Sequence, residues 1–286
     1  MRYKTLSIAG FDGSGGAGIQ ADLKTFSAFG CYGMTVLTAL PVQNTCGVKA
    51  CYELPLQAID DQLHTIFEDI RPDSIKIGML FKREIIELVA NFLRRYAAEI
   101  PIVLDPVLVA KSGDRLLLAD ALDTMRSALI PLATVITPNL PEAWDLIGEI
   151  HFSSDNMLEL ARKLIKLGPQ NVLLKGGHLS TSHSNDLLLN QEGEFYWFEG
   201  ARINSKNTHG TGCTLSAAIS ACLALGIELK EACKIAKEYV FKAIEAAKNE
   251  QIGLGHGPVH HFYNLWPTLT PREGKWLYDK SSATLS

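Results

Sequence analysis

The sequence of 286 residues has no surplus of positive charge and no long apolar run. Its 27 Lys and Arg residues are outnumbered by 31 Asp and Glu residues, which gives a formal net charge of −4. A chain without a basic surplus has little attraction for a phosphate backbone, which argues against nucleic-acid binding. No stretch of roughly 18 or more uninterrupted apolar residues occurs, which argues against a membrane span.

Closely spaced cysteine pairs are also missing, and no secretion signal is visible in the first residues. The six cysteines include no C-x-x-C pair, which disfavours both a zinc site and a disulfide framework. The first four residues lead directly into a short apolar run without a signal-type cleavage region, so we expect a soluble, cytoplasmic protein. With 47% apolar and 20% charged residues, the composition is that of a chain that folds on its own core.

Short β-branched runs alternate with amphipathic stretches of helical length, the pattern of βαβ units around a mostly parallel sheet. The expected strands are Leu6–Gly10, Met34–Leu40, Ser74–Gly78, Ile102–Asp105, Thr134–Thr137 and Asn171–Lys175, with a hairpin over Asp186–Phe198. The expected helices include one with an apolar stripe from Ile85 to Tyr96, and others over Ser154–Leu167, about Gly212–Leu225 and Leu229–Ala247. No repeat or linker divides the chain, so we expect one doubly wound α/β domain with helices on both faces.

Residues Gly13–Gly18 match the pattern G-x-G-x-x-G between an expected strand and an expected helix, which is the setting of a dinucleotide-binding fingerprint. That fingerprint needs an acidic residue at the end of the second strand to hold the ribose hydroxyls. The expected second strand runs into Thr38–Pro41 without an acid, so a nicotinamide- or flavin-dependent oxidoreductase is a disfavoured alternative. A Walker loop is also absent, because no G-x-x-x-x-G-K-[ST] sequence occurs.

A second glycine-rich loop, His209–Thr214, precedes a long Ala- and Leu-rich segment. Its glycines leave backbone N–H groups free to converge on an anion at a helix N-terminus, where the helix dipole adds positive potential. Such a loop suits a phosphoryl group that gains charge during transfer, and the alternative is a plain tight turn before a helix. Cys213 lies in the first turn of this helix, where the dipole favours a thiolate. We interpret it either as a reactive thiol or as a small packed residue.

Polar residues end three of the expected strands. Asp105, Thr137 and Lys175 each close a strand, and in open α/β sheets ligands bind beyond the carboxyl ends of the strands. Asn139 and Glu142 follow three residues apart, a spacing that brings an amide and a carboxylate onto one face. Two carboxylates with water are ligands that Mg²⁺ accepts beside substrate phosphates. The alternative for Glu142 is a helix acid of the first turn, favoured by the dipole, and the alternative for Lys175 is a solvated surface lysine.

Together these segments resemble the ribokinase-like superfamily, and within it the hydroxymethylpyrimidine/phosphomethylpyrimidine kinases of thiamine biosynthesis. The matching segments are Ser14–Phe26, Gln43–Thr45, Lys76–Leu80, Asp105–Val107, Lys111–Gly113, Thr137–Ala143, Lys175–His178 and Asn207–Cys213. The resemblance implies a single kinase domain over residues 1–261, with residues 262–286 as a C-terminal extension of unknown role. It also implies ATP-dependent phosphorylation of a hydroxymethyl group on a pyrimidine, followed by phosphorylation of the resulting monophosphate.

The resemblance further implies a role for each candidate residue. Gln43 would recognise the pyrimidine ring, in a pocket that Asp22, Met79 and Val107 would line. ATP would be bound by Thr137, Asn139 and Lys175, and Mg²⁺ would be organised by Glu142 and Asp105. The anion hole would consist of Gly210, Thr211, Gly212 and Cys213, with Lys175 acting beside it. Cys213 would be the base where many ribokinase relatives have an Asp.

Two alternatives of different kinds remain. Related enzymes of the fold act on pyridoxine or pyridoxal, so a B6-vitamer kinase is the nearer one. A non-catalytic small-molecule binding protein is the other, disfavoured because Lys175, Glu142 and Cys213 are retained. The resemblance implies a homodimer. Phe11 and Gly13 depart from the residues usual in this branch at the front of the pocket.

Overall fold

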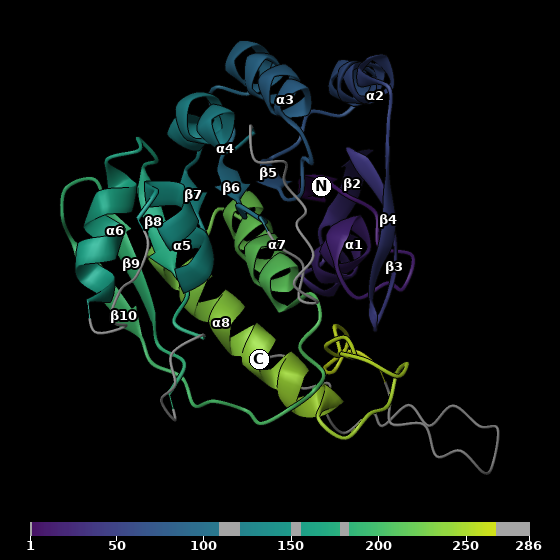
Figure 1. The fold of residues 1–286 in the computed structure, drawn as a ribbon, viewed down its shortest axis with the longest axis vertical. Helices are drawn as coiled ribbons and strands as arrows, with labels where there is room; N and C mark the ends of the chain where they lie inside the picture. Colours follow the sequence, from purple (N-terminus) through teal and green to yellow (C-terminus); the bar gives the residue numbers. More distant parts are fainter. Residues whose placement is uncertain (1, 109–120, 150–155, 178–182, 267–286) are drawn as a thin grey trace.

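The computed structural model describes residues 2–108, 121–149, 156–177 and 183–266 (Figure 1). The matching segment Lys111–Gly113, His178 and the chain from residue 267 onward lie outside the described residues. Within the described ranges, no helix is both long enough and apolar enough to cross a membrane.

An eight-stranded sheet forms the centre of the protein, in the order β10-β9-β8-β7-β6-β5-β1-β2. Its strands are β1 (Lys4–Ala9), β2 (Tyr32–Leu37), β5 (Ser74–Ile77), β6 (Ile102–Leu104), β7 (Val135–Ile136), β8 (Asn171–Leu174), β9 (Asp186–Asn190) and β10 (Phe195–Phe198). The pairs from β2 to β8 are parallel, whereas β9 and β10 join in antiparallel fashion. The predicted mostly parallel sheet, with a hairpin over Asp186–Phe198, is confirmed.

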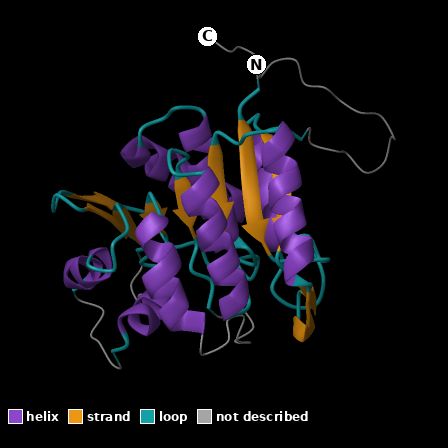
Figure 2. Ribbon diagram, turned by 90° about the horizontal axis from the view of Figure 1, so that it is seen from above, coloured by secondary structure: helices purple, strands orange, loops and turns teal. Residues whose placement is uncertain are grey.

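Helices cover both faces of the sheet (Figure 2). One face carries α1 (Gly18–Ala28), α7 (Thr211–Ala224) and α8 (Leu229–Ala247). The other carries α2 (Leu56–Asp69), α3 (Arg83–Tyr96), α4 (Ala121–Thr124), the short turns Met125–Leu129 and Ile130–Leu132, α5 (Leu140–Ile147) and α6 (Met157–Ile165). Successive side chains of β6 point to opposite faces of the sheet. Val103 packs in the hydrophobic cluster with α7 and α8, whereas Ile102 and Leu104 pack in the cluster with α3. Apolar residues on both faces are the reason these strands read as continuous apolar runs.

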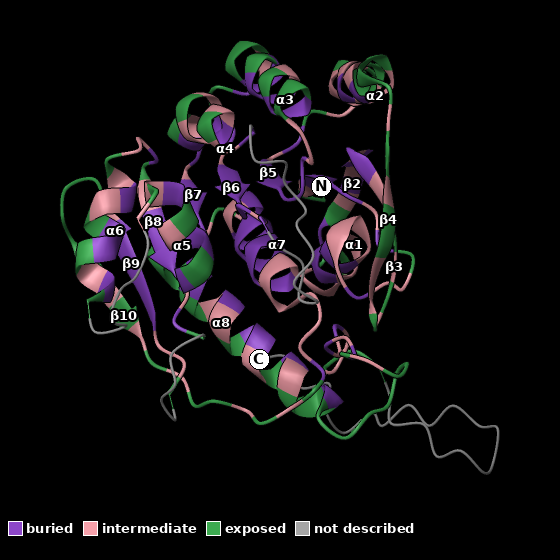
Figure 3. Cartoon of the chain, in the orientation of Figure 1, coloured by how far each residue is buried: buried purple, intermediate pink, exposed green. Residues whose placement is uncertain are grey.

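The predicted helices occur close to their expected bounds. α8 spans Leu229–Ala247 as predicted, and α7 begins at Thr211, one residue before the expected start. α6 lies within the predicted Ser154–Leu167, and Asn156 caps it by accepting a hydrogen bond from the Glu159 N–H at 3.1 Å. Most residues of α7 are buried (Figure 3), which fits its central place between α1, α8 and the sheet.

The expected single strand Met34–Leu40 is wrong. β2 ends at Leu37, and the chain then enters a separate two-stranded antiparallel sheet made of β3 (Ala39–Asn44) and β4 (Gly47–Glu53), which we call the flap. Thr38 fixes the change of direction, because its N–H donates to the Ala9 carbonyl at 3.0 Å and its hydroxyl donates to the Met79 carbonyl at 2.6 Å. The flap thereby carries Gln43 to the edge of the site.

Candidate active site

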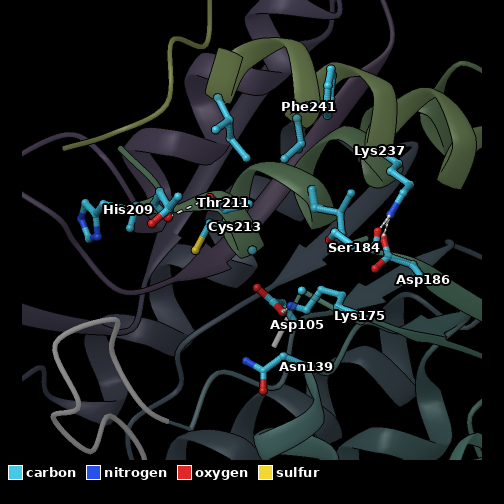
Figure 4. Close-up of a pocket in the computed structure, with 18 of the residues that line it drawn as sticks. Asp105, Asn139, Lys175, Ser184, Asp186, His209, Thr211, Cys213, Lys237 and Phe241 are labelled. Atoms are coloured by element: carbon cyan, nitrogen blue, oxygen red, sulfur yellow. Dashed lines mark hydrogen bonds and ion pairs between the residues drawn. The ribbon is translucent and has the colours of Figure 1, made fainter. Parts of the chain in front are cut away.

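An open cavity of ≈ 1490 Å³ follows the carboxyl ends of the parallel strands (Figure 4). Residues that follow β1, β6, β7 and β8 line it, together with the flap, the start of α7 and one side of α8. A pocket for one small ligand typically holds about 300–1,000 Å³. The cavity therefore has room for two ligands side by side.

Three of the predicted strand-end residues meet at the middle of this cavity. The carboxylate of Asp105 accepts hydrogen bonds at its Oδ1 from the Thr137 hydroxyl and from the Lys175 ammonium, both at 3.1 Å. Thr137 is fully buried beneath this contact. Burial alone would lower the pKa of Lys175, but the carboxylates of Asp105 and Glu142 raise it above its usual value. Lys175 is thus a charged, largely buried group of the cavity rather than a solvated surface lysine.

Glu142 fills both roles considered for it, because it caps α5 and faces the cavity. The Asn139 side chain accepts from the Glu142 N–H at 2.9 Å, and Glu142 Oε2 accepts from the Asn139 N–H at 2.8 Å, which is a capping box. The same Oε2 lies 4.0 Å from the Lys175 Nζ. Burial raises the pKa of Glu142 to about 7; Lys175 lowers it and Asp105 raises it further.

The side chains at this point fit a magnesium ion shared with a nucleotide. Asp105 and Glu142 bring two carboxylates against the one ammonium of Lys175. Burial is the main reason that the pKa of Glu142 is raised, and the neighbouring charge of Asp105 adds to it. In the parts of the chain that the structure describes, no group of three or more His, Cys, Asp or Glu side chains could hold a metal ion by itself. Mg²⁺ held beside phosphates needs only one or two carboxylates, so the two present are sufficient.

The start of α7 places the second glycine-rich loop directly against this cluster. Gly210 is the N-cap, with a φ of +75°, and the first turn leaves the N–H groups of Gly212 and Cys213 without partners inside the helix. A Cβ placed on Gly212 would lie 3.3 Å from Lys175 Nζ and 3.4 Å from Asp105 Oδ2. We call residues Gly210–Cys213 the anion loop. Its amides and the Lys175 ammonium converge on one place.

Cys213 lies at the cavity wall, where its environment opposes the effect expected from the helix dipole. Burial raises the pKa of Cys213 to about 11, and the charges of Asp22 and Asp105 raise it as well. Lys76 and the Gly18 N–H, which hydrogen-bonds the sulfur, lower it by less. The thiol is therefore neutral at pH 7, contrary to the thiolate that the dipole alone would favour.

Asp22 lies beneath the cavity and is fully buried. Its Oδ2 accepts from the Ser7 hydroxyl at 2.5 Å and from the Lys76 ammonium at 2.8 Å, while its Oδ1 has no hydrogen-bond partner among the described residues. Lys76, also fully buried, reaches the cavity floor. Lys76 was not among the residues predicted to form the site, although a lysine inside the apolar strand β5 is a signal that a buried carboxylate must lie nearby.

The remaining predicted substrate residues lie together at the flap end of the cavity, where Gln43, Met79 and Val107 contribute to the wall. The Gln43 amide donates to the Phe11 carbonyl at 3.3 Å. A Cβ on Gly10 would lie 2.9 Å from the Met79 sulfur, so glycine is needed there for Met79 to approach. Phe11, one of the two departures from the branch, lines the same end.

At the opposite end, α8 and the segment after β8 contribute residues that the sequence analysis did not single out. The Lys237 ammonium contacts Asp186 Oδ2 at 2.6 Å and the Ser184 carbonyl at 2.5 Å (Figure 4). Phe241 and Ile244 add apolar surface one and two turns further along α8. This end of the cavity therefore combines the Lys237–Asp186 ion pair with apolar surface from α8.

Three histidines, His256, His260 and His261, lie near the end of the described chain, and His261 has a clear structural role. His261 is buried, its Nε2 lies 3.1 Å from the Thr214 hydroxyl, and its carbonyl accepts from the Tyr239 hydroxyl at 2.5 Å. Burial lowers the pKa of His261 to about 3, so its imidazole is neutral at pH 7. It holds the end of the described chain against the first turn of α7.

The fold of this chain is similar to the folds of solved kinase structures. A structure described as pyridoxal kinase of Bacillus subtilis with ADP has a TM-score of 0.82 and 41% identity, covering 92% of this chain and 98% of that one. A phosphomethylpyrimidine kinase structure from Clostridium difficile has a TM-score of 0.75 and 44% identity, covering 85% of this chain and 100% of that one. The fold is that of the small-molecule kinases with a ribokinase-like fold.

Two sequence comparisons narrow the class further. The family model described as phosphomethylpyrimidine kinase matches residues 12–260. The hydroxymethylpyrimidine/phosphomethylpyrimidine kinase of Salmonella typhimurium is 48% identical over 267 residues, which is 93% of this chain and 100% of that protein. The chain belongs to the phosphomethylpyrimidine kinase family, whose members are phosphotransferases.

Proposed function

We propose that this cavity phosphorylates the hydroxymethyl group of 4-amino-5-hydroxymethyl-2-methylpyrimidine with ATP, and then phosphorylates the monophosphate to the diphosphate used for thiamine. The observation that carries the proposal is the place of Gly212 within 3.3–3.4 Å, measured from an added Cβ, of Lys175 and Asp105. Backbone donors, a cation and a carboxylate thus converge between the flap end and the α8 end, where the two substrates would meet.

Positioning and electrostatics would supply most of the rate acceleration. Lys175 would contact the nucleotide phosphates, and Asp105, held by Thr137, would keep the ammonium in place. The amides of the anion loop would hold the transferring phosphoryl group. Mg²⁺, when bound by Glu142 and Asp105, would neutralise charge on the phosphates. Asn139 would support this by fixing Glu142 through the capping box.

The substrate hydroxyl must lose its proton as its oxygen attacks the γ-phosphorus and the bond to the ADP oxygen breaks. Cys213 is our candidate to receive that proton, because its sulfur lies in the first turn of α7, within the anion loop. Ionisation of the thiol is costly in the free chain, since its pKa is about 11. The base role is therefore the part of the proposal that most needs a direct test.

A coupled ADP-release assay tests the proposed function. We expect the highest kcat/KM with the hydroxymethylpyrimidine and its monophosphate, and lower values with pyridoxine and pyridoxal. Faster turnover of the B6 vitamers would support the alternative kinase. Absence of ADP release with every substrate would support a binding protein without catalysis.

Replacing Gln43 by leucine should impair recognition more than chemistry. The Gln43 amide stands at the flap end of a largely apolar wall, where it can pair with an aminopyrimidine edge. Unpaired substrate groups in a buried site cost about 1–3 kcal/mol, so we expect kcat/KM for the pyrimidine to fall by roughly one to two decades. The matched control is Gln57→Leu on the exposed side of α2, which should change nothing. Unchanged selectivity between pyrimidine and pyridoxine in the Gln43 variant would rule out this role.

Replacing Glu142 by glutamine should raise the Mg²⁺ concentration needed for half-maximal activity and should slow phosphoryl transfer. The change removes the negative charge next to Lys175 and weakens the capping box, which contributes about 0.5–2 kcal/mol. The matched control is Glu159→Gln, because Glu159 has the same place after the N-cap of α6 but is exposed. If Glu142→Gln shows only the stability loss of the control, with normal Mg²⁺ dependence, its role is capping alone.

The homodimer implied by the resemblance and the cytoplasmic location expected from the sequence stay predictions. Light scattering on the purified chain measures the first, and fractionation of cells measures the second.

A further inference from the structure

The first glycine-rich loop, Gly13–Gly18, is organised around one buried carboxylate. Asp12 is fully buried, and its Oδ1 accepts from the N–H and the hydroxyl of Ser14 at 3.0 and 2.6 Å. Its Oδ2 accepts from the N–H groups of Gly16 and Ala17 at 3.1 and 2.7 Å. The same Oδ2 accepts from His209 Nε2 at 2.8 Å, although the two residues are 197 positions apart. One carboxylate therefore closes the loop and also joins it to the residue before the anion loop.

The two glycine-rich loops touch through their backbones. A Cβ placed on Gly210 would lie 1.7 Å from the Gly16 carbonyl oxygen, and a Cβ on Gly16 would lie 2.3 Å from His209 Cδ2. No side chain fits at either position. The glycines of Gly13–Gly18 that match a dinucleotide fingerprint thus serve, at Gly16, the close contact with the anion loop.

His209 is held from two sides. Its N–H donates to the Gly257 carbonyl at 3.0 Å, and its side chain contacts Asp12. Gly210, the N-cap of α7, follows directly, and Gly212 lies against Lys175 and Asp105. A shift of His209 would therefore move the backbone donors of the anion loop relative to Lys175.

We propose that Asp12, acting through His209, is a positioning residue that holds the anion loop in register with Lys175 and Asp105 for phosphoryl transfer. The proposal rests on the proposed function of the anion loop. Asp12 itself does not line the cavity in the described part of the chain, so it acts on the anion loop indirectly, through His209 and through the backbone of Gly16 that it also holds.

The electrostatics of Asp12 agree with this role. Burial alone would raise the pKa of Asp12, but hydrogen bonds from His209 and Ser14 lower it to about 2. The carboxylate stays ionised at neutral pH and can only accept hydrogen bonds. His209 Nε2 is therefore the donor, whatever the charge of the imidazole.

Steady-state kinetics of paired variants tests the proposal. Misplacement of catalytic donors by about 1 Å can cost roughly 10²-fold, so we expect Asp12→Asn and His209→Ala to lower kcat by roughly 10- to 100-fold. KM for the pyrimidine should change little, because the flap end is not altered. His209→Gln places an amide N–H donor near the position of Nε2 and should recover most of the loss. The double variant Asp12→Asn/His209→Ala should be no slower than the slower single variant, since both break one contact.

The control is His64→Ala, which removes another histidine paired with an aspartate. His64 Nδ1 lies 3.3 Å from Asp60 Oδ1 on α2, and its ring packs edge-on against Phe92. This variant should lose stability and keep kcat. If Asp12→Asn and His209→Ala behave like His64→Ala, with lower thermal stability and kcat within about twofold of the wild type, the pair is only structural and the proposal is wrong.

A second readout needs no turnover. ADP with aluminium fluoride mimics the transferring phosphoryl group, and its complex should bind more weakly to Asp12→Asn by about the factor lost in kcat, with ADP alone unaffected. Equal binding of the mimic to wild type and variant would overturn the positioning role. If the wild-type chain released no ADP with any substrate, the proposed function would fail, and the binding measurement would still decide the role of Asp12.

Discussion

Replacing Cys213 by alanine is expected to lower kcat by about 10²–10⁴-fold, the usual contribution of a positioned general base. Cys213→Asp should restore part of the loss if a carboxylate can take the place of the thiol. The matched control is Cys222→Ala, a buried cysteine on the same helix that lies outside the cavity lining. Stopped assays at saturating substrate measure kcat directly. A Cys213→Ala variant with a nearly normal kcat would assign proton removal to another group and leave Cys213 as packing.

The pH dependence of the wild type tests the same role independently. Because burial raises the pKa of Cys213 to about 11, the ionised fraction of the thiol rises roughly tenfold for each pH unit below that value. If the thiolate is required, kcat/KM should climb from pH 7 to pH 9 without a plateau. Glu142, with a pKa of about 7, loses its charge as the pH falls through 7 and should add a further loss on the acid side. A plateau above pH 7, with an acid-side loss that disappears in Glu142→Gln, would point to Glu142 as the only titrating group.

Replacing Lys76 by methionine should produce the largest loss of stability. The ammonium is the partner of Asp22 in a fully buried ion pair at 2.8 Å, and removing one member of such a pair typically costs about 3–5 kcal/mol. Removal would leave Asp22 with the Ser7 hydroxyl as its hydrogen-bond partner among those the structure shows. Chemical denaturation should reveal the change as a lower free energy of unfolding.

Two further variants distinguish whether an unpaired buried charge or lost packing causes this loss of stability. Asp22→Asn/Lys76→Met removes both charges, so it should be far less destabilised than Lys76→Met alone. Lys242→Met breaks an exposed pair with Glu238 on α8 and should leave stability unchanged. If the double variant were as unstable as Lys76→Met, the loss would come from packing rather than from an unpaired buried charge.

The local sequence pattern was sufficient to predict those helices and strands whose apolar periodicity lies within their own residues. α8 carries its apolar stripe within its own residues, and β6 shows its burial by an unbroken apolar run. The prediction of one strand over Met34–Leu40 was wrong because the Thr38 hydroxyl donates a hydrogen bond to the Met79 carbonyl, 41 residues away. Nothing in the neighbouring sequence indicates that hydrogen bond. The flap that follows was missed for the same reason.

The residues of the site were likewise predictable only where local sequence places them. Asp105 and Lys175 were expected near each other because parallel strands bring their carboxyl ends to one edge of the sheet. In the structure the Lys175 Nζ lies 3.1 Å from Asp105 Oδ1. The partners of Lys76 and Asp12 were not foreseeable from spacing, because each pair joins distant segments. The pKa of Cys213 depends on burial, which the position of a residue in a helix does not reveal.

The contact between Asp12 and His209 has a consequence for biosynthesis. Translation proceeds at roughly 5–20 residues per second, so the 197 positions between them correspond to roughly 10–40 s on the ribosome. For as long as synthesis has not reached α7, the elements β1, α1, β5 and β6 lack the helix that packs against all four of them. A nascent chain at this stage exposes apolar surface and has no anion loop, so it is a natural client for chaperones. By the proposed mechanism, phosphotransfer can begin only after the chain has emerged beyond the anion loop at residues 210–213, late in synthesis.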